Sequence, residues 1–112
     1  MDRIEALAMI GDGHTVWKPD YAEEICKAFG VSFPKSLVKP FRNEAHYKGY
    51  HGQEADGVYS LTLSQHVAQC LGVADKAASF LGRGSQAREY ARVVAEKLGI
   101  DTRREASGQV AR

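Results

Sequence analysis

The sequence predicts a small, mainly α-helical single domain, and three observations support this. The chain has 112 residues, which is enough for one hydrophobic core and too few for two. Apolar residues recur at helical spacing in several segments, most of which end at a glycine. Alternating, β-prone stretches are short and few. We therefore expect a bundle of five to six short helices over residues 1–100, followed by a charged tail at 101–112 that frays.

The first third of the chain predicts two helices separated by a short strand. A first helix carries Ile4 and its apolar neighbours on one face and ends at Gly11. The β-prone residues 14–17 follow it. Pro19 suits the first turn of a second helix, whose apolar stripe lies within residues 21–29.

The middle of the chain predicts little helix and one strand. Residues 32–38 can form a short third helix, which Pro40 ends because it biases the preceding residue away from helical angles. Residues 42–56 lack periodicity and predict a long loop. The alternation in residues 57–63 favours a strand, and its natural partner in a two-stranded β-ribbon is the segment 14–17.

The last half of the chain predicts three further helices. Thr62 and Gln65 have the spacing of a capping box, so a fourth helix is expected to start there and to end at Gly72. A short fifth helix is expected over residues 75–81. The strongest amphipathic pattern lies in residues 85–98, which predict the longest helix.

Charge and cysteine content favour an intracellular, non-catalytic protein. The net charge is +1, but residues 57–112 carry 8 Lys/Arg against 5 Asp/Glu, so this half is mildly basic and suits a phosphate-bearing partner. No apolar run is long enough to span a membrane and no export signal opens the chain, so we expect a cytoplasmic protein. Cys26 and Cys70 fall in helical patterns and are interpreted as small buried hydrophobes. Together with His46 and His51 they lack metal-site spacing, so neither a metal nor a cofactor is expected.

Residues 64–84 carry the most informative motif. Ala68 supplies a small residue in a first helix, Leu71-Gly72-Val73 supply an apolar turn, and Ala78 and Leu81 supply an inward face of a second helix. This arrangement resembles the prokaryotic helix-turn-helix family, in which the second helix enters the major groove of DNA. The resemblance implies that the helix from Asp75 reads DNA. The residues expected to contact DNA are Lys76, Ser79, Arg83, Ser85 and Arg88.

Two observations bear on this motif. The fragments Phe29-Gly30-Val31, Leu71-Gly72-Val73 and Leu98-Gly99-Ile100 are similar, and each fits an ordinary helix stop, so residues 64–82 can equally be a helical hairpin of the core. Residues 82–85 precede the longest predicted helix and place Arg83 beside free backbone N–H groups, where an anion such as a DNA phosphate can bind.

Two functions follow as expectations. The first is a small bacterial or phage regulator that binds duplex DNA through residues 64–82, as a homodimer because one such unit contacts few base pairs. The alternative is an inhibitor of another protein, of the kind that mobile genetic elements encode, such as an anti-CRISPR protein. It would act through the aromatic and basic loop 42–51. The interface residues expected for this alternative are Trp17, Arg42, Tyr47, Lys48 and Tyr50.

Overall fold

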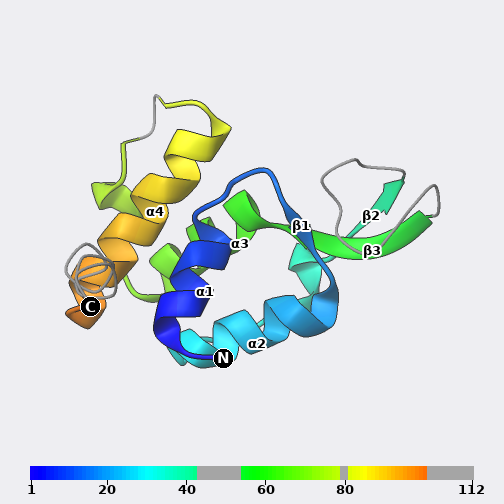
Figure 1. The fold of residues 1–112 in the computed structure, drawn as a ribbon, viewed down its shortest axis with the longest axis horizontal. Coiled ribbons are helices and arrows are strands. Elements are labelled where there is room, and N and C mark those ends of the chain that lie inside the picture. Colours follow the sequence, from blue (N-terminus) through cyan, green and yellow to red (C-terminus); the bar gives the residue numbers. More distant parts are fainter. Residues whose placement is uncertain (43–53, 79–80, 101–112) are drawn as a thin grey trace, which may run out of the picture.

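The protein folds into four α-helices and a small antiparallel sheet in the residues that the structure describes. The structure is a computed structural model that describes residues 1–42, 54–78 and 81–100. Its α-helices are α1 (Arg3–Ile10), α2 (Pro19–Phe29), α3 (Ser60–Cys70) and α4 (Arg83–Leu98), and its strands are β1 (Val16–Trp17), β2 (Lys39–Arg42) and β3 (Glu54–Tyr59). Two 3-10 turns, η1 (Lys35–Leu37) and η2 (Ala74–Lys76), complete the order. Figure 1 shows the helices gathered on one side, with β2 and β3 extending away from them.

One core joins all four α-helices. Its largest fully buried side chains include Ile10 of α1, Ile25 of α2, Leu63 of α3 and Val94 of α4. Ile25 and Val94 lie on the predicted apolar stripes, whereas Leu63 was expected in a strand; the prediction of a mainly α-helical fold is confirmed. None of the helices in the described ranges is long and apolar enough to cross a membrane.

The β-ribbon is confirmed but is part of a larger sheet. β3 lies in the middle of three strands in the order β1-β3-β2, and it pairs antiparallel with β1 through Val16 opposite Tyr59. The third strand, β2, was not predicted, because Pro40 was interpreted only as the end of a helix. Proline lacks the N–H that a central strand needs, but β2 is an edge strand, where that N–H is not required.

The predicted five to six helices are too many. The third helix, expected over residues 32–38, is only the single turn η1, since Val38 already has extended angles and leads into β2. The expected loop 42–56 contains the first residues of β3, and its residues 43–53 lie outside the described ranges, as does the tail 101–112. The strand predicted over residues 57–63 ends at Tyr59, and residues 60–63 are already helical. The fourth helix therefore begins at Ser60 rather than Thr62, because β3 runs directly into it.

The fifth helix, expected over residues 75–81, is also wrong as secondary structure. The 3-10 turn η2 ends at Lys76, and Ala77 is extended, with φ −86° and ψ 143°. Gly72 adopts φ +74° after α3, and the N–H of Val73 donates to the carbonyl of Ala68 at 2.9 Å. This is the hydrogen bonding of a helix stop. Gly30 and Gly99 end α2 and α4 in the same left-handed backbone conformation.

Candidate functional site

The first turns of α4 bring together three of the residues predicted to contact DNA. Arg83, Gly84 and Ser85 open the helix after Gly82, whose N-cap position provides no side-chain hydrogen bond. Arg88 follows one turn later, and its Nη2 donates to the Ser85 Oγ at 3.1 Å. We call Arg83, Gly84, Ser85 and Arg88 the α4 N-terminal cluster. A helix of 16 residues has free N–H groups and a partial positive charge at this end, so the cluster is suited to an anion.

Arg83 is held in place by an aromatic ring. Its guanidinium carbon lies 5.3 Å from the centroid of the Tyr59 ring, at the end of β3. A cation over an aromatic face is attracted by the ring quadrupole, and Arg83 still remains exposed. The contact therefore orients the charge without removing it from solvent.

The loop between α1 and β1 packs against the first turn of α4. Gly13 has φ +83°, and a Cβ built on it would lie 2.8 Å from the carbonyl oxygen of Arg83 and 2.8 Å from the Cα of Gly84. A Cβ on Gly84 would in turn lie 3.0 Å from the Nε2 of His14. The two glycines thus allow backbone-to-backbone packing that fixes the direction of the α4 N-terminal cluster.

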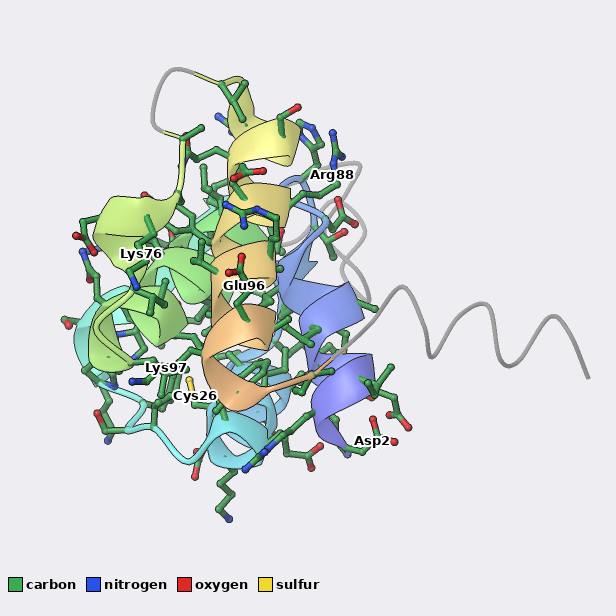
Figure 2. All side chains as sticks on the ribbon, turned by 90° about the vertical axis from the view of Figure 1, so that its left-hand side faces the viewer. Asp2, Cys26, Lys76, Arg88, Glu96 and Lys97 are labelled. Carbon is green, nitrogen blue, oxygen red and sulfur yellow. The ribbon has the colours of Figure 1, made fainter. Side chains whose placement is uncertain are left out.

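Lys76 lies apart from this cluster. It lines a cleft between η2 and the second half of α4, together with Val93, Glu96 and Lys97. Figure 2 shows Lys76 to one side of α4 and Arg88 near the upper end of the helix on the other side. Since Ser79 lies outside the described residues, the structure places only three of the five predicted DNA contacts in one cluster.

The exposed face of α4 between these two places is not basic, since it carries Arg92 against Glu89 and Glu96. Arg92 donates to Glu89 from Nη2 at 3.0 Å and also bonds Glu96. The hydrogen bond from Arg92 lowers the pKa of Glu89, and the same bond raises the pKa of Arg92. The unbalanced positive charge of α4 is therefore concentrated at its two ends rather than along its middle.

Part of the predicted protein-binding surface is described. Trp17 is half-buried, its Nε1 donates to the Met9 carbonyl at 3.3 Å, and its ring meets Tyr21 edge-on with centroids 6.3 Å apart. Tyr21 is 49% exposed, although the sequence placed it on the apolar stripe of α2. The backbone of Arg42 ends β2. Tyr47, Lys48 and Tyr50 lie outside the described residues.

The two cysteines differ sharply in environment. Cys26 is buried, and desolvation, followed by the charges of Cys70 and Glu23, raises the pKa of its thiol to about 12. Cys70 is exposed, so the prediction that it is buried is wrong: it lies beyond the face of α3 that packs inward. Its Sγ lies 3.5 Å and 3.8 Å from the two ring nitrogens of His66, a residue that the sequence analysis overlooked.

Within residues 1–42, 54–78 and 81–100, no three His, Cys, Asp or Glu side chains gather where they could hold a metal ion. No protein-family model, curated protein or solved structure matches this chain.

Proposed function

We propose that the protein is a non-catalytic, duplex-DNA-binding protein that holds a backbone phosphate at the α4 N-terminal cluster. The observation that carries the proposal is that Arg83 and Arg88 lie in the first two turns of a helix whose start has no side-chain cap. Backbone N–H groups at a helix start and arginine side chains are two of the standard phosphate contacts of DNA-binding proteins. Gly13 packs closely against the first turn of α4, and this packing supports the proposal because it holds the N–H donors of that turn in one arrangement.

The proposal differs in one respect from the helix-turn-helix expectation. A single 3-10 turn such as η2 is too short to lie along a major groove, so Lys76 is assigned a secondary phosphate contact rather than base reading. The first turns of α4 then become the element that approaches DNA. Because one such contact area covers few base pairs, we propose that a regulator of this kind acts as a homodimer.

The test is the salt dependence of binding to a labelled duplex of random sequence, measured by fluorescence anisotropy. Each phosphate contact contributes about 0.9 to the slope of log K against log salt concentration. The double variant Arg83→Ala/Arg88→Ala is expected to bind more weakly and to lower the magnitude of the slope by about 2.

A matched control removes the same charge elsewhere. Lys27 and Lys35 are both exposed and line a hollow between α2 and η1, away from the α4 N-terminal cluster. Lys27→Ala/Lys35→Ala is expected to leave the slope close to that of the parent. Equal slopes for the two double variants, or a parent affinity that does not change with salt, would overturn the assignment.

The second candidate function is inhibition of a protein partner, and the exposed Tyr21 beside Trp17 favours it. Tyrosine and tryptophan contribute most to protein interfaces, and this pair is partly accessible on α2 and β1. If this function is correct, Tyr21→Ala weakens capture of a partner protein, whereas Arg83→Ala/Arg88→Ala leaves that capture unchanged.

A further inference from the structure

The cleft between η2 and the second half of α4, which we call the η2–α4 cleft, carries an excess of positive charge. Its volume is about 340 Å³, and the buried side chains of Val73 and Val93 lie in it. The charged side chains that line it are three cations and one carboxylate: Lys76, Arg92, Lys97 and Glu96. Figure 2 shows both lysines on one side of α4, away from Arg88.

Two of these charges neutralise each other. Arg92 forms an ion pair with Glu96 and a second one, at 3.0 Å, with Glu89. Lys76 and Lys97 are both exposed, and neither forms an ion pair with another residue of the described ranges. The η2–α4 cleft therefore keeps two positive charges that no carboxylate offsets, and it is suited to an anionic group.

A second hollow of the same general kind has no such excess. The hollow between α2 and η1 is also lined by two exposed lysines, Lys27 and Lys35, but Glu23 and Asp56 line it with them. Paired lysines in a hollow are thus not enough to make it positive. The comparison singles out the η2–α4 cleft, and it supplies a control with the same residue types.

The size and lining of the η2–α4 cleft favour a carboxylate side chain as the occupant. Its volume is near the lower end of the range for ligand pockets, about 300–1,000 Å³, so it takes a side chain rather than a whole helix. A carboxylate can accept hydrogen bonds from both ammonium groups. The methylene groups of a glutamate would contact Val73 and Val93, whereas a DNA phosphate brings no aliphatic chain.

We propose that the η2–α4 cleft is a docking site for an acidic segment of a partner protein, with a glutamate or aspartate carboxylate held between Lys76 and Lys97. The site is separate from the α4 N-terminal cluster, so the inference does not depend on DNA binding there. Because Lys76 is also assigned a secondary phosphate contact, the acidic segment and the duplex are expected to compete for this one amine.

The test is a selection of binding peptides from a phage-displayed library of random decapeptides against the immobilised full-length protein at low salt. The expected result is enrichment of peptides in which at least two glutamates or aspartates lie close together. The affinity of a selected, labelled peptide is then measured by fluorescence anisotropy, and it is expected to fall as salt is added. No enrichment, or enrichment of neutral or basic peptides, would overturn the proposal.

Two charge-reversed variants locate the selected peptide. Lys76→Glu/Lys97→Glu is expected to weaken its binding by at least about tenfold, because two attractive charges become repulsive. Lys27→Glu/Lys35→Glu is the matched control, since it makes the same change in net charge in the hollow between α2 and η1. It is expected to bind within about twofold of the parent. All four lysines are exposed, so circular dichroism should report an unchanged fold. Equal losses in the two variants would overturn the assignment.

Lys97→Gln separates this site from the DNA proposal, because Lys97 has no assigned DNA contact. This variant is expected to weaken peptide binding by about threefold and to leave duplex affinity unchanged. Arg83→Ala/Arg88→Ala is expected to do the reverse. If Lys97→Gln weakens duplex binding and not peptide binding, the cleft belongs to DNA and the proposal is wrong. A parent dimer that Lys97→Gln converts to monomer in analytical ultracentrifugation would assign the cleft to a second copy instead.

Discussion

Substituting Gly13 by alanine is expected to disturb the packing that supports the α4 N-terminal cluster. At φ +83° an L residue is strained by about 1–2 kcal/mol. The new Cβ would also lie 2.8 Å from two backbone atoms, the Arg83 carbonyl oxygen and the Gly84 Cα, and neither can rotate away as a side chain could. Overpacking of this kind costs about 1–3 kcal/mol more. The expected loss of unfolding free energy is therefore about 2–5 kcal/mol.

Gly30→Ala separates the two contributions. Gly30 has φ +71°, and a Cβ there would meet nothing within 4 Å, so this variant carries the strain without the clash. Both changes stiffen the unfolded chain to the same degree. In urea unfolding, Gly13→Ala is expected to be less stable than Gly30→Ala by about 1–3 kcal/mol. If the two variants unfold at the same urea concentration with equal slopes, the close packing of the loop against α4 is refuted.

Two further changes test the core. Ile25→Ala truncates a side chain that is 0% exposed in the core between the helices. We expect urea unfolding to show a loss of about 2–5 kcal/mol in unfolding free energy. A loss under about 1 kcal/mol would show that Ile25 is not in the core. The raised pKa of Cys26, about 12 in the folded chain, predicts that its contribution to stability is complete below pH 9 and is lost as the pH rises toward 12, because only the unfolded thiol ionises in that range. The slope is about 1.4 kcal/mol per pH unit, and it should be absent from Cys26→Ala; parallel curves for parent and variant would contradict the burial of this thiol.

Local patterns were enough to predict the longer helices. The stripe containing Ile25 and the stripe containing Val94 define α2 and α4, because a face that repeats every turn must be buried against something. Gly30 and Gly99 end these helices where expected. β2 could not be predicted in this way, since Phe41, which is buried, gives no alternation by itself and the pairing of the strand depends on β3, beyond residues 43–53.

The site was predicted unevenly for similar reasons. Gly82, Arg83 and Gly84 at the start of α4 are a local signal, and Arg83, Ser85 and Arg88 lie in the first two turns of this helix. The segment after Gly72 has apolar residues at helical spacing, but it forms only the single 3-10 turn η2, after which Ala77 is extended. The pattern was too short to distinguish one turn from a helix, so the prediction of a fifth helix was wrong. His66 and Cys70 were separable from the core only by knowing which face of α3 packs inward, although their four-residue spacing was visible.

The most direct measurement is a two-dimensional amide NMR titration of the labelled protein with a short DNA duplex at low salt. Phosphate binding at the start of α4 predicts that the largest shifts fall on the backbone amides of Gly84 and Ser85, and that they shrink as salt is added. No shifts at any DNA concentration, or shifts confined to Trp17 and Tyr21, would contradict the assignment of DNA binding to this helix.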